Sequence, residues 1–200
     1  MHGKCMDGKK EAGHLLRRAA FSATRREVEA AVALGREETV SRLVGGQSLT
    51  GEKENLASFT ELKADGKALA EDQIGDHQTY WLYRMAYTQA PLIEKMTLFW
   101  HGHFATSYQK VREIPLMIRQ NELLRKNALG SFKELVRQIG KDPAMMLWLD
   151  SGSNRKGKPN ENYAREVMEL FTLGIGSYSE QDVKEAARAF TGWNYDKKGG

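Results

Sequence analysis

The stretch KPNENYAREVMELFTLGIGSYSEQDVKEAARAFTGW, from Lys158 to Trp193, decides the fold of this chain. Asn160 is a favourable N-cap and Gly174 a favourable residue just beyond a helix C-terminus, so we expect a helix between them. Ser179 then opens a sequence that resembles a capping box, which predicts a second helix. Two well-delimited helices in so short a stretch predict a helical fold.

The first of these two helices is amphipathic when it is placed on a helical wheel, and its polar side carries mixed charges. Arg165 lies four residues from Glu161 and four from Glu169, so it can pair with either carboxylate. One interpretation is a solvated, salt-bridged surface. The other is the wall of a cleft in which Asn162, Glu166 and Glu169 face a ligand or a metal. Periodicity does not decide between the two.

The rest of the chain predicts further short helices, because capping residues and prolines recur at helix-sized intervals. Thr24 with Glu27 forms a capping-box pattern for a helix that Gly35 closes. Asp142 before Pro143 is a cap followed by a proline at the first helical position. The expected fold class is therefore mainly α, a bundle of short helices joined by short loops.

The domain organisation expected from this pattern is simple. Residues 1–12 form a disordered lead-in, and residues 13–200 form one helical domain. The apolar pattern weakens at about 47–75, which indicates a loosely ordered loop within that domain. Residues 194–200 look like a strand that enters a small β-hairpin at the C-terminal end.

Composition excludes few functions. Thirty Lys and Arg residues against 26 Asp and Glu give a net charge of +4, a weak indication of an anionic partner. The single cysteine, Cys5, rules out an intrachain disulfide. The sequence contains no apolar run of membrane-spanning length and no specific nucleic-acid module. Met1 to Lys10 shows no secretory signal, so either the chain is cytoplasmic or its start has been trimmed.

His101 and His103 are the first candidates for chemistry. From an extended segment, two imidazoles two residues apart can share one metal, whereas on a helix they point about 200° apart. If the helix that starts at Pro91 continues past them, His103 lies on its apolar side and His101 on the polar side, with Glu94 and Thr97. Three roles stay open: a shared metal, a structural hydrogen bond, and one histidine that acts as general acid or base.

The loop Gly152 to Lys158 matches the pattern Gly-x-x-x-x-Gly-Lys. A phosphate-binding loop needs a Ser or Thr after the lysine, but Pro159 follows here and supplies neither a hydroxyl nor an N–H group. A plain connector, or a flexible basic loop that touches an anionic ligand, fits the sequence better than a nucleotide site.

Several motifs in this chain, in the same order, resemble those of the bacterial domain-of-unknown-function 1800 family. The likeness runs from about Gly13 to the end of the chain. Between the two histidines the family commonly has Asn, where this chain has Gly102. The motifs that carry the resemblance are HLLRRAAFS from His14, FWHGHFATS from Phe99, PNENYARE from Pro159, ELFTLG from Glu169, and the run from Tyr178 to Trp193.

This resemblance implies no reaction, because the family carries no established activity. Members usually continue well past the Gly-Trp motif, which implies that a C-terminal part of the domain is missing and would be a partner of this chain. Members are often exported, so the compartment stays undecided.

Two function hypotheses follow. The first is a hydrolase-like enzyme whose cleft lies between the histidine segment and the helix after Asn160. In it His101 and Glu166 would be catalytic, a divalent metal would bind to His103 and Glu169, and an anionic ligand would contact three residues, namely Asn162, Arg165 and Arg188. The second is a non-catalytic binding or scaffold domain for a cell-surface partner or a polysaccharide, in which the same residues form a hydrogen-bond network between helices.

Overall fold

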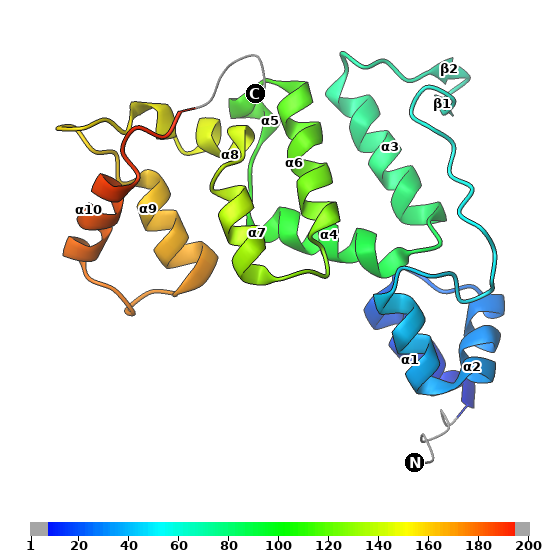
Figure 1. Cartoon of the computed structure of the whole chain (residues 1–200). Helices are drawn as coiled ribbons and strands as arrows, with labels where there is room; N and C mark the ends of the chain where they lie inside the picture. Colours follow the sequence, from blue (N-terminus) through cyan, green and yellow to red (C-terminus); the bar gives the residue numbers. More distant parts are fainter. Residues whose placement is uncertain (1–7, 195–200) are drawn as a thin grey trace. The chain divides into compact units, whose positions relative to one another are not determined.

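The computed structural model describes residues 8–194, and it confirms the mainly α fold class. Figure 1 shows short helices joined by loops. The helices are α1 (Gly8–Ala19), α2 (Arg25–Val44), α3 (Ile74–Tyr87), α4 (Pro91–His103), α5 (Tyr108–Val111), α6 (Ile114–Lys126), α7 (Phe132–Ile139), α8 (Pro143–Trp148), α9 (Asn162–Glu166) and α10 (Glu180–Ala189), with a 3-10 helix η1 (Ser151–Ser153) and a π-helix η2 (Val167–Thr172).

Local capping fixes where several helices begin. The side chain of Thr24 accepts from the backbone N–H of Glu27, and the Glu27 side chain accepts from Thr24 in return, so this capping box is confirmed. Ser179 forms the same arrangement at the start of α10. Each such cap satisfies N–H groups that a helix leaves without partners, and is worth about 1 kcal/mol. Gly35, with φ 78°, breaks α2 where a helix end was expected.

The chain divides into two compact units, with the boundary between Leu98 and Phe99, inside α4. In the first unit, α1 packs beside α2 (Figure 1). Helix α1 already begins at Gly8, within the expected lead-in, and residues 1–7 lie outside the described part. Burying each large aliphatic side chain stabilises the fold by roughly 1.5–3 kcal/mol. The buried cluster consists of Ala12, Leu16, Ala19, Ala31, Leu43 and Leu49.

The segment expected to be a loosely ordered loop contains a small antiparallel hairpin, β1 (Lys63–Ala64) with β2 (Lys67–Ala68). Asp65 and Gly66 connect the strands with positive φ values of 50° and 77°, as a tight turn between antiparallel strands requires. Side chains of α3 hold this segment elsewhere. The Ala57 N–H donates to the Tyr83 hydroxyl at 3.0 Å, for example.

Helix α4 differs from its expected pattern. Glu94 and Thr97, placed on the polar side by the wheel, are buried, whereas Leu98 and Phe99 are exposed. Glu94 tolerates burial because it accepts from Trp81 and pairs with an arginine of α3. Wheel position alone therefore gave the wrong exposure for this helix.

The second unit has its own core, built around Phe104 and helices α6, α7 and α8. This principal core consists of Phe104, Leu124, Leu135, Ile139, Met145, Leu149 and Phe171. A smaller cluster joins α9 to α10 through Ala164, Val183 and Ala187. The small side chains let the two helices approach closely, and Figure 1 shows them side by side. In the stretch from Gly8 to Asn194, no helix is both long and apolar enough to cross a membrane. The hairpin expected at 194–200 falls almost wholly outside the described residues.

Candidate functional site

The helix predicted after Asn160 changes from α-helical to π-helical hydrogen bonding halfway along. The Asn160 side chain accepts from the Asn162 N–H at 2.9 Å and so starts α9. From Val167 the chain continues as the π-helix η2, in which the Leu173 N–H donates to Met168 O, five residues back, at 2.9 Å. Such π segments occur frequently at functional sites. They also turn the residues that follow away from their positions on an ideal wheel.

Arg165 joins α9 to α10. Its guanidinium donates to both carboxylate oxygens of Glu180, at 2.9 and 2.8 Å, and to Glu161 at 3.1 Å. The hydrogen bond and charge of Arg165 lower the pKa of Glu180. The expected pairing with Glu161 is confirmed, and Glu180 is a partner that the sequence did not indicate. Arg188 likewise donates to Glu185, at 2.7 Å.

Glu166 and Glu169 have different surroundings although they lie one turn apart. The Tyr178 hydroxyl donates to Glu169 at 2.9 Å. Glu166 accepts no hydrogen bond from any of the described residues. Burial raises the pKa of Glu166, and the charge of Glu169 raises it further. Glu166 is therefore the member of this pair that is better suited to carry a proton.

His103 belongs to an aromatic cluster. Its Nε2 lies 3.1 Å from Phe171 O, and because a carbonyl can only accept, this nitrogen donates. The imidazole packs edge-on against Phe104, with ring centroids 4.7 Å apart. His101 lies on the same helix, α4, and is partly buried. The residues predicted for metal binding thus have defined partners, namely Phe171 for His103 and Tyr178 for Glu169.

Metal binding needs several ligands on one centre. Among residues 8–194, no group of three or more His, Cys, Asp or Glu side chains could hold a metal ion. A site made by His103 and Glu169 would need further ligands, or water, to complete tetrahedral or octahedral coordination. The divalent metal and the catalytic roles of His101 and Glu166 stay predictions. Asn162 is exposed at the start of α9.

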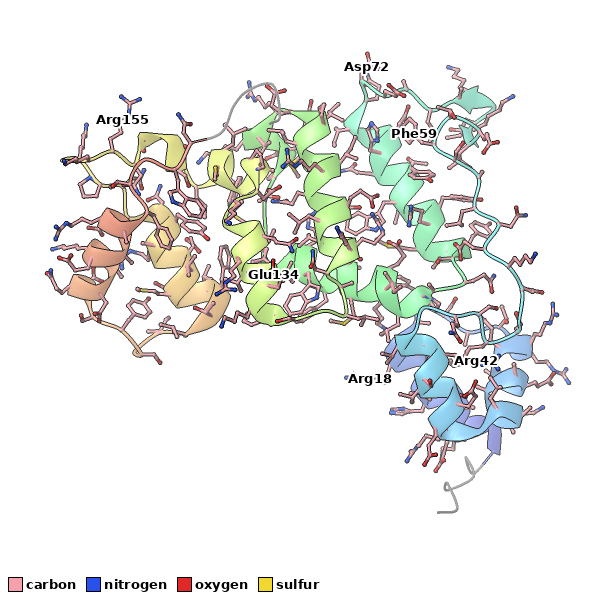
Figure 2. All side chains as sticks on the ribbon, viewed as in Figure 1. Arg18, Arg42, Phe59, Asp72, Glu134 and Arg155 are labelled. Atoms are coloured by element: carbon pink, nitrogen blue, oxygen red, sulfur yellow. The ribbon has the colours of Figure 1, made fainter. Side chains whose placement is uncertain are left out.

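The loop after α8 is held in place by hydrogen bonds of asparagine side chains. The Asn154 side chain donates to Ala187 O at 2.9 Å and accepts from the Asn160 N–H at 2.9 Å. Its main-chain carbonyl accepts from Gly192. The basic tip of the loop is a turn closed between Arg155 and Lys158, and Figure 2 shows the Arg155 side chain pointing outward. Asn154 therefore ties the loop to α10, while the lysines and arginine lie in solvent.

Asn154 and Asn160 also line a pocket that was not predicted from the sequence. The hydroxyl of Tyr163 lies so close to Gly140 that a Cβ on this glycine would be 2.2 Å from it. Burial raises the pKa of Tyr163 to about 12, so the phenol stays neutral at ordinary pH. The signal in the sequence is the repeated asparagines, Asn154 and Asn160, which flank the basic loop. The lining includes Ser151, Asn154, Asn160, Tyr163, Phe190 and Trp193.

Comparison with known proteins bears on the family and not on the reaction. No curated protein and no solved structure matches the chain. A family model described as "Protein of unknown function (DUF1800)" matches residues 14–200 and so confirms the resemblance of the sequence motifs. The chain therefore belongs to the DUF1800 family of proteins of unknown function.

Proposed function

We propose that the chain is a non-catalytic binding domain, for a cell-surface partner or a polysaccharide, in which the motif residues hold the helices together. The observation that carries the proposal is the state of Arg165, which already makes a two-point contact with Glu180 and a third contact with Glu161. A bidentate arginine–carboxylate pair is the strongest common form of ion pair. An incoming anion would have to displace these carboxylates from Arg165.

The neighbouring groups support the same proposal. Arg188 pairs with Glu185, Tyr178 with Glu169, and His103 with a main-chain carbonyl. The Arg165 contacts join α9 to α10, Tyr178 ties η2 to the loop after it, and His103 ties α4 to η2, whereas the Arg188 pair lies within α10. A network of this kind serves to keep a binding surface rigid, which reduces the entropy lost when a partner binds.

The pocket supports a neutral partner over an ionic one. Its lining contains amides, hydroxyls and aromatic rings and no charged side chain. Burying an unpaired ion in such surroundings is strongly unfavourable, whereas a neutral hydroxylated ligand finds both hydrogen-bonding groups and apolar surface.

The test compares binding with turnover. The full chain is incubated with insoluble cellulose, chitin and peptidoglycan, and with chromogenic glycosides, esters and phosphate esters. We expect retention on at least one polysaccharide, without release of chromophore. Glu166→Gln should leave retention unchanged, as should the matched control Glu185→Gln on an exposed carboxyl. Chromophore release that Glu166→Gln abolishes and Glu185→Gln preserves would overturn the proposal.

A hydrolase-like enzyme is the second candidate, and the state of Glu166 is the observation that favours it. Its pKa is raised by burial and by Glu169, while Glu169 is held by Tyr178. A carboxyl whose surroundings raise its pKa, close to a second carboxyl, is typical of general acid–base sites. The metal-assisted form is tested by metal analysis of protein purified without chelator. Stoichiometric metal that is lost from a folded His103→Gln variant would favour the enzyme.

A further inference from the structure

Ser151 and Tyr163 both line the pocket, and each carries a hydroxyl. Across residues 8–194, neither hydroxyl has a hydrogen-bond partner, although Ser151 is only 8% exposed. Hydroxyl groups withdrawn from bulk water are nearly always hydrogen-bonded in folded proteins. Neither oxygen is fully buried, and both residues line the same pocket, so a molecule held there would supply partners to both hydroxyls.

The amides of the pocket are already committed. The Asn154 side chain bonds to Ala187 O and to the Asn160 N–H, while the Asn160 side chain donates to the Ser153 hydroxyl at 2.6 Å. These bonds fix the walls of the pocket. Among the described residues, the pocket groups without a partner are the hydroxyls of Ser151 and Tyr163 and the indole N–H of Trp193. Two groups that both donate and accept, beside one donor, match another hydroxyl better than they match a cation.

Aromatic rings form the other side of the pocket. Phe190 packs edge-on against Tyr163, with centroids 5.0 Å apart, and edge-on against Trp193, at 5.9 Å. Trp193 is partly exposed, so one part of its ring is available to a ligand. Aromatic faces beside hydroxyl groups suit a pyranose ring, which has apolar C–H faces and a rim of hydroxyls.

The enclosed space is about that of one ordered water molecule, so it accommodates a single hydroxyl and not a whole sugar ring. We propose that this pocket receives one hydroxyl of a neutral carbohydrate, hydrogen-bonded by Ser151 and Tyr163, while the sugar ring lies against Trp193 outside it. This inference rests on the proposed binding function and names its ligand class and its site.

The experiment measures affinity of the full chain for three neutral oligosaccharide probes, cellohexaose, chitohexaose and laminarihexaose, by titration calorimetry. Tyr163→Phe removes one hydroxyl and keeps the ring. Gly140→Ala places a Cβ where the Tyr163 hydroxyl now lies, and so drives the phenol out of position. The matched control is Tyr178→Phe, which removes a hydroxyl that bonds to Glu169 and does not line the pocket.

We expect at least one probe to bind, Tyr163→Phe to weaken it by roughly three- to tenfold, and Tyr178→Phe to leave it unchanged. Gly140→Ala should abolish binding in protein that circular dichroism shows to be folded. Binding that is equal in wild type and Tyr163→Phe overturns the pocket assignment, as does a pocket that holds an ordered water only, while the binding function stands. Absence of binding to all three probes, together with no retention on any polysaccharide, overturns both.

Discussion

Glu94 in the first unit and Asp142 in the second are both carboxyls with only 2% of their surface exposed, yet they are accommodated in different ways. Glu94 accepts from the indole of Trp81 at 3.0 Å and pairs with the Arg84 guanidinium at 3.1 Å. Its negative charge therefore has a positive partner. Breaking such a pair leaves an uncompensated buried charge, which is far less favourable than the pair itself.

Asp142 has neutral partners instead. One oxygen accepts from the Gln120 amide at 2.7 Å and from the Met145 N–H at 3.0 Å, while Oδ1 is buried without a hydrogen bond within the described residues. Burial raises the pKa of Asp142, and the hydrogen bonds and the charge of Arg119 only partly oppose this. Exposure alone therefore does not set the charge of a buried carboxyl. The chemistry of its nearest donors decides whether the charged or the protonated form fits.

The largest effect should follow from removing the cation in the first unit. Arg84→Met keeps much of the aliphatic length but leaves Glu94 buried without its guanidinium. We expect the free energy of unfolding to fall by about 3–5 kcal/mol, measured by denaturant titration. Adding Glu94→Gln to this variant should recover part of the loss, since the negative charge that Arg84 balanced is then gone. A loss below about 1 kcal/mol would mean that Glu94 does not depend on Arg84.

A smaller, pH-dependent effect is expected at Asp142. Because its pKa is raised in the folded state, that state binds the proton more tightly than the unfolded chain does. The contribution to stability is therefore highest below the ordinary pKa of an aspartic acid and falls as the pH rises from that value to the raised one. Asp142→Asn retains a good N-cap residue and cannot titrate.

The check is unfolding of wild type and Asp142→Asn by denaturant at a series of pH values from mildly acidic to neutral. The variant should gain stability relative to wild type as the pH increases. If the free energy of unfolding changes with pH in the same way for both proteins, the charged form of Asp142 fits its site as well as that of Glu94 does. That result would contradict the contrast between the two sites.

The smallest effect should come from Arg165, which makes three contacts with carboxylates but is partly exposed. Surface ion pairs are screened by solvent and by salt. Arg165→Ala should lower the melting temperature slightly in dilute buffer, and the difference should shrink in high salt. Arg188→Ala, with one exposed pair, is the matched control and should change less. A large loss of melting temperature that salt does not change would contradict this and would show that Arg165, like Arg84, pairs with a carboxylate shielded from solvent.

Features that depend on adjacent residues could be predicted from the sequence. The capping boxes at Thr24 and Ser179 were read correctly, because cap and partner lie three residues apart. The hairpin at Asp65-Gly66 is not among the predicted elements, although this dipeptide is a strong hairpin signal. Its strands are so short that no alternating pattern accompanies it.

Features that depend on tertiary contacts could not be predicted. Arg165 bonds to Glu180, which lies fifteen residues away on the next helix. Glu94 sits on the polar side of its wheel, and its burial makes sense only with Arg84 of α3 in place. The pocket exists because Gly140 has no side chain where Tyr163 ends. The wheel also assumes 100° per residue, which fails from Val167 onward.

The π-helix η2 makes the packing of this helix sensitive to the deletion of a single residue. A π turn is equivalent to one extra residue inserted into an α-helix, so it shifts the phase of everything that follows by about 100°. Both α9 and η2 contribute to each cluster: Ala164 and Met168 pack against α10, while Tyr163 and Phe171 pack in the core around Phe104. Deleting one residue between Val167 and Thr172 would restore an unbroken α-helix and rotate the later side chains out of step. The hydrogen-bonding register of η2 thus sets which of its side chains pack in the core around Phe104 and which pack against α10.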